Sequence, residues 1–362
     1  MSVNVNHEDL KAFCEKVFVK LDVAENDAKI AADNLVLADL RGIPSHGVAR
    51  LQRYVDGIKN GLIYPKHKPE IEKETPSTAL VNGNDGLGQV AGHFGTSVAI
   101  DKAKATGVGI VTVKRSNHYG IAGYYSQMIL KEGLLGISMT NSAPLVVPTF
   151  GKEMIFGTNP ISLTAPANRN RPFFLDMATS VVPRGKLEVY NRGEKALPEG
   201  WAVNALGKVT TSPAEVLQNM LNRAGGGILP LGGEGELYSG HKGYGMAILV
   251  DILTGVLSGG AWTNLVYGKK DGKTVPPNVC HFFMALKIEN FIDIDEFKNN
   301  MDDLIDRLKS SQKAEGKERI YIHGEKEYEL YDKHAADGIP LEDKVYNTLK
   351  NIAADLGVDF TI

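Results

Sequence analysis

The chain has 362 residues, of which 43% are hydrophobic and 23% charged, and its formal net charge is -3. This composition is typical of a folded globular protein with room for two domains, and it argues against extensive disorder. Because the charge is nearly balanced and no basic run stands out, nucleic acid is not an expected partner.

Three features concern the compartment and the membrane. The first nine residues lack the basic start and apolar core of a secretion signal, so we expect a cytoplasmic protein. The longest weakly polar stretch, residues 243–262, is rich in glycine and interrupted by Asp251, and we expect a buried helix there rather than a membrane span. Cys14 and Cys280 lie in apolar periodic segments, which favours reduced core thiols over a disulfide or a zinc site.

The beginning of the chain has the apolar spacing of helices. Asn6 is a good cap for a first helix, whose apolar face runs from Leu10 to Leu21. A second helix is expected from about Glu25 to Leu40. Residues 63–76 contain three prolines and alternating charge, so we expect a segment that crosses between two domains.

The next stretch should begin a third helix. Pro44 breaks the preceding helical pattern, and Ser45 is a good N-cap for a helix that ends near Gly61. His46 is therefore expected at the first helical position, with Arg50, four residues later, on the same face.

His46 and Arg50 together indicate acid–base chemistry on an anion. Imidazole can take a proton from a hydroxyl and return it, and a helix N-terminus would keep His46 neutral. The planar guanidinium of Arg50 suits bidentate binding of a carboxylate. The pair predicts a site for a small hydroxy or keto acid. On local spacing alone, a solvated helix start with a capping serine and an incidental histidine is the more common explanation, because short motifs have many false positives.

From Thr78 onward, short apolar runs alternate with glycines, which is typical of an α/β domain. A glycine-rich stretch at 225–245 precedes a strongly apolar segment, and no internal repeat is present. Strands are predicted at 78–81, 109–113, 134–140, 161–165, 173–177 and 281–288, and helices at 89–105, 120–131, 246–257, around 297–308, and 343–356.

Several common enzyme motifs are absent. No pair of glycines completes G-x-G-x-x-G, and the one Gly-Lys-Thr, at 272–274, lacks the earlier glycine of a phosphate loop. There is no H-E-x-x-H and no G-x-S-x-G. Rossmann, P-loop, zinc-hydrolase and serine-hydrolase sites are therefore all disfavoured, and no metal is expected.

Three loops remain that could offer backbone donors to phosphates. Residues 115–120 follow a predicted strand and open a helix, residues 176–186 follow another strand, and residues 240–245 precede the apolar helix. Backbone N–H groups at helix starts favour anion binding. Each loop separately would also suit an ordinary turn or cap, but their joint presence favours a phosphate-bearing ligand.

Seven separated motifs, in order along residues 5–350, resemble the malate/L-lactate dehydrogenase family. This non-Rossmann family also contains sulfolactate, ureidoglycolate and diketogulonate dehydrogenases. The motifs are Ser45–Gly47 with Arg50, Ser116–Gly120, Phe156–Pro160, Asp176–Ser180, Arg184–Lys186, Gly240–Gly245 and Gly324–Glu325.

The resemblance implies an α/β (α+β) fold of two domains. Residues 1–76 and 246–362 would form a helical domain that carries the catalytic histidine. Residues 77–245 would form a central nicotinamide-binding domain around a largely antiparallel sheet, which would explain the missing glycine fingerprint. The resemblance also implies a homodimer or larger homo-oligomer, with the site near a subunit contact.

Site roles follow from the same resemblance. His46 would donate and accept the proton with Ser45 as relay partner, and Arg50 and Thr158 would contact substrate. Where imine-reducing members carry an aspartate, this chain has Lys186, as hydroxy-acid members do, so we expect Lys186 to contact substrate as a second cation for a dicarboxylate. Cofactor contacts would be His118, Tyr119, Gly120, Ile121, Ala122, Asp176, Met177, Ala178, Arg184, Gly185, His241, Lys242, Gly324 and Glu325.

The expected activity is hydride transfer between a nicotinamide cofactor and a small 2-hydroxy or 2-keto acid. Malate and oxaloacetate are the first expected pair, and lactate, sulfolactate and ureidoglycolate stay open. NAD is the expected cofactor, with NADP also open. Two alternatives come from other classes, a cofactor-independent isomerase or lyase that uses the same histidine, and a ligand-binding protein without catalysis.

Overall fold

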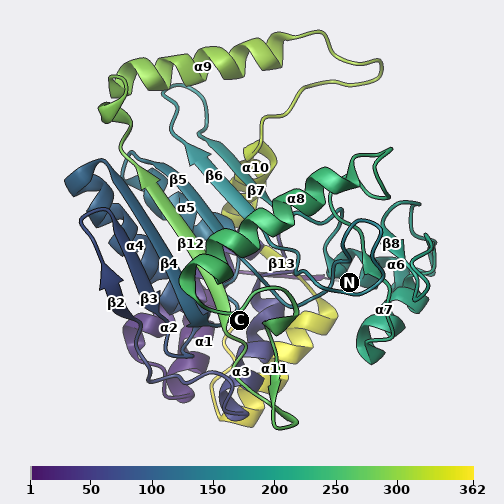
Figure 1. Cartoon of the computed structure of the whole chain (residues 1–362). Helices are drawn as coiled ribbons and strands as arrows, with labels where there is room; N and C mark the ends of the chain where they lie inside the picture. Colours follow the sequence, from purple (N-terminus) through teal and green to yellow (C-terminus); the bar gives the residue numbers. More distant parts are fainter. Residues whose placement is uncertain (1) are drawn as a thin grey trace.

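A seven-stranded sheet forms the centre of the computed structural model, which describes residues 2–362 (Figure 1). Its strand order is β2-β3-β4-β12-β5-β6-β7, and only β3 and β4 run parallel. The largely antiparallel sheet expected for the central domain is therefore confirmed. The strands are β2 (Glu70–Glu74), β3 (Thr78–Asn82), β4 (Val108–Ser116), β5 (Leu135–Thr140), β6 (Ile161–Ala165), β7 (Phe173–Met177) and β12 (Val279–Leu286).

Helices cover both faces of this sheet. On one face, α4 (Gly88–Thr106) and α5 (Ala122–Lys131) bury a core that includes Phe283. On the other face, α8 (Gly240–Asp251) and the π-helical turn that follows it, Ile252–Val256, cover Phe282 (Figure 1). The two neighbouring phenylalanines of β12 point to opposite faces because side chains alternate along a strand.

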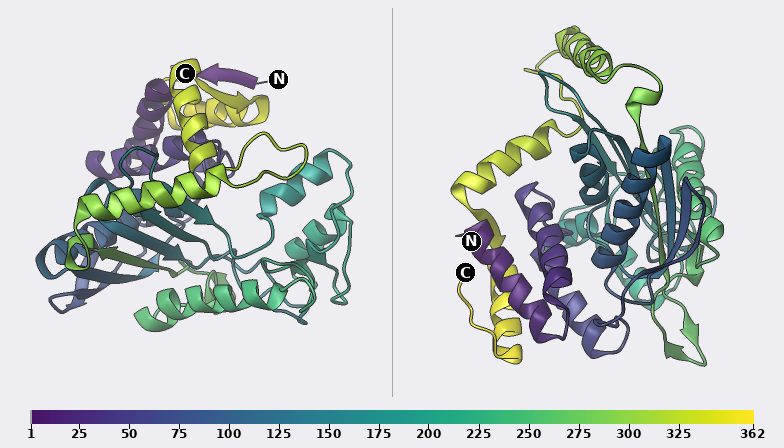
Figure 2. Two further views of the ribbon diagram at one scale, coloured as in Figure 1. Left: turned by 90° about the horizontal axis from the view of Figure 1, so that it is seen from above. Right: turned by 90° about the vertical axis from the view of Figure 1, so that its left-hand side faces the viewer.

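A helical layer lies beside the sheet, and both ends of the chain contribute to it (Figure 2). The N-terminal strand β1 (Ser2–Val5) pairs with β13 (Ile339–Glu342) near the C-terminus. Asn6 caps the first helix as predicted, with its side chain accepting the Glu8 N–H at 2.8 Å. The helices that share this core are α1 (His7–Lys20), α2 (Glu25–Leu40), α3 (Leu51–Lys59) and α11 (Asp343–Leu356).

Two further parts complete the molecule. A small lobe beside the N-terminal end of α8 contains α6 (Arg184–Arg192), α7 (Pro213–Asn222) and the paired strands β8 (Ala202–Val203) and β9 (Gly227–Ile228) (Figure 1). The last third of the chain adds the hairpin β10 (Lys269–Lys270) and β11 (Lys273–Thr274), and the helices α9 (Ile294–Ser310) and α10 (Glu325–Asp337). None of the helices within residues 2–362 combines the length and the hydropathy needed to span a bilayer.

The structure corrects several sequence-based expectations. The proline-containing segment 63–76 ends in an edge strand, β2, although its side chains are exposed. Strand β12 lies between β4 and β5, although residues 246–362 were expected to belong to the helical domain. The division into two domains at residues 76 and 246 stays a prediction, but the sheet itself draws on both segments.

The apolar segment 243–262 is not the buried helix that its composition suggested. Leu249, Ile252, Val256 and Leu257 are 44%, 50%, 51% and 57% exposed, respectively. Asp251, the only charged residue of this segment, is buried and accepts the Thr263 N–H at 3.0 Å. One side of α8 and its continuation therefore presents an uncharged apolar stripe to the surroundings.

Candidate active site

The predicted catalytic residues meet in one cavity of about 340 Å³, called here the histidine cavity. It lies where the turn before α3, the loop after β4, the loops after β5 and before β6, and the start of α6 converge. It is lined by Ser45, His46, Arg50, Arg53, His118, Tyr119, Gly120, Thr140, Asn141, Ser142, Ala143, Leu145, Thr158, Pro160, Pro183, Arg184, Gly185, Glu188, Tyr267 and Val279.

His46 sits in a turn and not at the first position of a helix, so that expectation was wrong. A 3₁₀ turn begins at Val48, and α3 begins at Leu51. The buried Asp39 carboxylate, at the end of α2, accepts the Val48 N–H at 2.7 Å. A Cβ on Gly47 would lie 2.0 Å from Asp39 Oδ1. Asp39 therefore caps this turn from outside it, in place of Ser45.

The hydrogen bonds around His46 fix its ring relative to its neighbours. Ser45 Oγ lies 2.9 Å from His46 Nδ1, and Arg50 Nε donates to the Ser45 carbonyl at 2.6 Å. If Nδ1 carries the proton and donates it to Ser45, the lone pair of Nε2 stays available as a base. The Nη groups of Arg50 are left to bind an anion.

Burial lowers the pKa of His46 to about 4, and the charges of Arg50 and Arg53 lower it further in the same direction. His46 is therefore neutral at physiological pH, as expected. The cause is different, because the sequence interpretation relied on a helix N-terminus, whereas burial and two cations act here.

His118 stands beside His46, with the two rings stacked at a centroid distance of 5.6 Å. Its Nδ1 lies 2.6 Å from the hydroxyl of Tyr54, which is fully buried on α3. Burial, followed by the charge of Arg53, lowers the pKa of His118 well below its ordinary value. The cavity thus holds two neutral imidazoles, each with one nitrogen engaged by a hydroxyl group.

Sequence reasoning missed several residues of this cavity. Tyr54 follows Arg50 by one helical turn, so the spacing alone could have placed it near the site. Arg53 lies among the polar residues of an amphipathic helix, so nothing in the sequence distinguished it from a solvent-exposed arginine. Thr140, Asn141 and Tyr267 could not be assigned, because only the tertiary structure brings the ends of β5 and β12 to this point.

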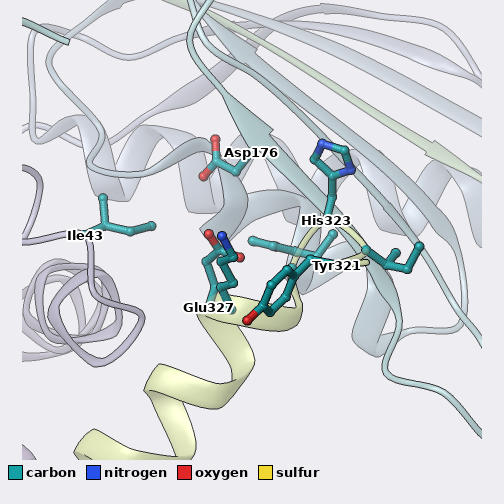
Figure 3. Close-up of a pocket in the computed structure, with 9 residues that line it drawn as sticks. Ile43, Asp176, Tyr321, His323 and Glu327 are labelled. Carbon is teal, nitrogen blue, oxygen red and sulfur yellow. The ribbon is translucent and has the colours of Figure 1, made fainter. Parts of the chain in front are cut away.

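A second cavity of about 240 Å³ lies at β7 and the start of α10 and is called here the acidic cavity. Figure 3 shows the carboxylates of Asp176, from β7, and Glu327, from α10, beside the same space. Asp176 Oδ2 accepts the Gly123 N–H in the first turn of α5 at 2.8 Å. The lining residues are Ile43, Phe174, Asp176, Tyr321, Ile322, His323, Gly324, Lys326 and Glu327.

Burial raises the pKa of Asp176 to about 6. The hydrogen bond from Gly123 and the charge of Arg41 act against this shift, and the negative charge of Glu327 adds to it. The pKa of this carboxyl group is thus closer to physiological pH than that of an ordinary aspartate.

The predicted cofactor residues divide between these places. His118, Tyr119, Gly120, Arg184 and Gly185 line the histidine cavity, and Asp176 and Gly324 line the acidic cavity. Ile121 is the N-cap residue of α5 and Ala122 is its first residue, so both lie in the segment that joins the two cavities. Met177 is the last residue of β7, and Ala178 follows it. Lys186, His241 and Lys242 are exposed and line neither cavity.

Glu325, predicted to contact the cofactor, is engaged elsewhere. Its carboxylate accepts from Lys309 Nζ at 2.5 Å, from Arg319 Nη2 at 3.2 Å and from the Ile322 N–H at 3.0 Å. These contacts tie the end of α9 and the following loop to the start of α10. The position of Gly324 at the acidic cavity is therefore supported by Glu325, which itself lies outside the lining.

Along the part of the chain that the structure describes, no three His, Cys, Asp or Glu side chains gather as they would around a metal ion. The two cysteines are both buried and unpaired.

Known proteins resemble this chain along almost its whole length. A family model described as malate/L-lactate dehydrogenase matches residues 5–350. The chain is 52% identical over 356 residues to a malate dehydrogenase of Pyrococcus abyssi, covering 98% of this chain and 96% of the relative. It is 41% identical to the malate/(S)-sulfolactate dehydrogenase of Methanothermus fervidus, covering 99% of both. The crystal structure of malate dehydrogenase from Entamoeba histolytica matches the fold with a TM-score of 0.95 at 38% identity, covering 100% of both chains.

Proposed function

Since the chain belongs to the malate/L-lactate dehydrogenase family, we propose that its histidine cavity interconverts malate and oxaloacetate with NAD as the cofactor. The family and the enzyme class agree with the resemblance in the sequence. The observation that carries the choice of site is a neutral imidazole, His46, beside Arg50, whose Nη groups remain available to an anion.

In the oxidation direction, the Arg50 guanidinium holds the substrate carboxylate, and Thr158, which lines the same cavity, orients the substrate. His46 Nε2 takes the proton of the C2 hydroxyl, while Ser45 Oγ keeps the ring oriented through Nδ1. A nicotinamide cofactor, when bound, would supply the acceptor for the hydride of C2. In reduction, protonated His46 returns the proton to the carbonyl oxygen. An anionic substrate beside His46 raises its pKa and makes this return easier.

The residues present fit a nicotinamide dinucleotide. The loop 118–122 lines the histidine cavity at His118 and Gly120 and leads to Gly123, whose N–H is bonded to Asp176 of the acidic cavity. A long ligand could therefore contact both cavities along this loop. We propose that the acidic cavity takes hydroxyl groups of a ribose, because carboxylates accept such hydrogen bonds and repel a 2′-phosphate. This favours NAD over NADP.

We further propose that the enzyme is a homodimer whose second copy covers the apolar stripe of Leu249, Ile252, Val256 and Leu257. An uncharged stripe is complementary to itself across a twofold axis, and Trp262 and Leu265, 40% and 53% exposed, extend it. Sedimentation of an Ile252→Glu variant should show monomers, whereas Leu304→Glu, at an equally exposed leucine of α9, should leave the dimer intact. A monomeric wild-type protein would remove this proposal.

A cytoplasmic location is proposed as well, because the reaction draws on the pool of free nicotinamide cofactor. Cell fractionation followed by an activity assay tests it, and activity confined to a membrane or secreted fraction would contradict it.

The activity is tested with a panel of 2-keto acids, each mixed with NADH or NADPH and followed by the loss of nicotinamide absorbance. Oxaloacetate with NADH should give the highest kcat/KM, and pyruvate should come second. Titration of the protein with NADH, followed by the fluorescence of the reduced cofactor, separates this function from a cofactor-independent isomerase or lyase. Absence of both binding and turnover would rule out the proposed dehydrogenase.

A further inference from the structure

Three arginines line the histidine cavity, and their charges are compensated unequally. Arg184 Nε lies 3.0 Å from Glu188 Oε1, so this pair is nearly neutral. Arg50 donates to the Ser45 carbonyl, and Arg53 donates to the Tyr267 hydroxyl, both of which are uncharged acceptors. Among the residues that the structure describes, Arg50 and Arg53 therefore bring two positive charges to the cavity without a carboxylate partner.

The guanidiniums of Arg50 and Arg53 have different hydrogen-bond partners. Arg50 and Arg53 are three residues apart at the start of α3, but one side chain turns to Ser45 and the other to Tyr267, which follows α8 in sequence. Both charges act on His46 and on His118. A small acid that reaches His46 and binds Arg50 therefore lies within the field of Arg53 as well.

Tyr267 is held in a conformation that serves this contact. Its φ angle is +61°, a left-handed conformation that an aromatic residue rarely adopts, and its N–H donates to the Pro277 carbonyl at 3.0 Å. The Arg53 guanidinium carbon lies 5.5 Å from the centroid of the Tyr267 ring. Backbone strain of this kind persists where the surrounding structure imposes it, often at functional sites.

We propose that Arg53, positioned by Tyr267, binds the second anionic group of the substrate and so selects dianionic 2-keto and 2-hydroxy acids over monoanionic ones. This rests on the proposed dehydrogenase function. The second group is a carboxylate or a sulfonate, since a guanidinium pairs with either. Arg53 thereby takes the role that the sequence suggested for Lys186, which is exposed and outside the cavity.

The selectivity follows from a second charged hydrogen bond that only a dianion can make. A dianion pairs with both guanidiniums, whereas a monoanion such as pyruvate pairs with Arg50 alone and leaves the exposed Arg53 guanidinium to water. The dianion therefore gains one charge-assisted hydrogen bond over the monoanion.

The test compares kcat/KM for oxaloacetate, sulfopyruvate and pyruvate in the full-length enzyme. Arg53→Gln should lower kcat/KM for oxaloacetate by about 10 to 100-fold, the usual effect of a lost charged hydrogen bond, and change that for pyruvate by only a few-fold. Tyr267→Phe, which removes only the hydroxyl, should shift the oxaloacetate-to-pyruvate ratio in the same direction by less. Arg192→Gln, at an exposed arginine in the last turn of α6, is the matched control and should leave the ratio unchanged.

Each outcome has a distinct meaning. An equal loss on oxaloacetate and pyruvate, or an unchanged ratio in both variants, would overturn the role of Arg53 while the dehydrogenase function stands. A preference for sulfopyruvate that Arg53→Gln abolishes supports the role and assigns the second group as a sulfonate. Lack of turnover on every keto acid in the wild-type enzyme would instead contradict the proposed function itself. If Arg53→Gln does not fold, Tyr267→Phe decides the matter alone.

Discussion

The histidine cavity and the acidic cavity differ in the sign of their charge. The histidine cavity combines two imidazoles with Arg50 and Arg53, and its one carboxylate, Glu188, is paired with Arg184. The acidic cavity is lined by the carboxylates of Asp176 and Glu327 and by one lysine, Lys326, so negative charge predominates. A positive cavity suits an organic acid, and a cavity with two carboxylates suits the hydroxyl groups of an uncharged sugar. The difference supports separate places for substrate and for part of the cofactor.

Burial nevertheless acts on both cavities in the same way, because it favours the uncharged form of each group. It lowers the pKa of His46 to about 4 and raises that of Asp176 to about 6. Like charges nearby reinforce each shift, from Arg50 and Arg53 in the first case and from Glu327 in the second. A neutral histidine is a competent base, whereas the carboxylate of Asp176, still mostly ionised above pH 6, accepts hydrogen bonds.

The largest expected difference between the two cavities is in kcat, when a histidine is removed from each in turn. His46→Ala should lower kcat on the native substrate by about 10² to 10⁴-fold, the range for a lost general acid–base group. His323→Ala removes an exposed histidine of the acidic cavity and should change kcat by only a few-fold. If His46→Ala kept wild-type turnover and His118→Ala lost it, His118 and not His46 would be the proton-transfer group.

The same protonation state predicts a pH profile. Because the pKa of free His46 is lowered to about 4, the base form is present at all higher pH values. In the oxidation direction, kcat/KM should therefore lose activity on the acid side only as pH falls toward about 4. A bound anion raises this pKa, so the acid limb of kcat should lie at higher pH than that of kcat/KM. Coincident limbs would mean that the substrate anion does not lie beside His46.

A smaller loss is expected when the carboxylate contact is weakened. Arg50→Lys keeps the positive charge but removes the planar fork, so KM for the keto acid should rise by about 10 to 100-fold. The affinity for NADH, measured by fluorescence titration, should stay within a few-fold of the wild type. An unchanged KM would show that Arg50 does not bind the substrate carboxylate.

A substitution in the acidic cavity should weaken cofactor binding and leave substrate binding unchanged, the reverse of the effect of Arg50→Lys. Asp176→Asn can still accept the Gly123 N–H but removes a negative charge, so NADH should bind about 10-fold more weakly, and the preference for NADH over NADPH should narrow. The KM for the keto acid should be nearly unchanged. Equal NADH affinity in the variant would separate this cavity from the cofactor.

The smallest expected effect concerns stability. Asp176 has a folded pKa of about 6 against an ordinary value of 3.8, so its burial costs stability as pH rises from about 4 to 6, and the cost stays constant above that. Relative to the wild type, the free energy of unfolding of Asp176→Asn should therefore be higher at pH 8 than at pH 4, by on the order of 2 to 3 kcal/mol. Asp303→Asn, at an exposed carboxylate of α9, is the control and should show no such difference.

Local patterns predicted much of the fold and the core of the site. The bounds of α2, β6, β7 and α11 agree with the spacing of apolar residues, and Asn6 caps α1 as expected. Local spacing predicted His46 and Arg50, the family resemblance added Thr158 and His118, and all four line one cavity. The helices, strands, cap and helical spacing depend on hydrogen bonds and side-chain periodicity within a few residues, which a sequence displays directly.

Other features depend on partners far apart in the chain. The Tyr54–His118 hydrogen bond joins residues 64 positions apart, and the contact of Arg53 with Tyr267 joins residues 214 positions apart. The segment after residue 246 was wrongly expected to be buried, because composition indicates that a helix is apolar but not which neighbours cover it.

Within the described residues, the sequence by itself predicted eight of the eleven helices and six of the seven strands of the central sheet, but not α6, α7 or α10. It also indicated the family and a neutral histidine close to an arginine. Only the tertiary structure decided that Asp39 caps the turn of His46, that Arg53 and not Lys186 reaches the cavity, and that Glu325 supports the acidic cavity from outside. The reason is physical, because local backbone preferences act over a few residues, whereas the packing of the sheet against its helices brings distant side chains together.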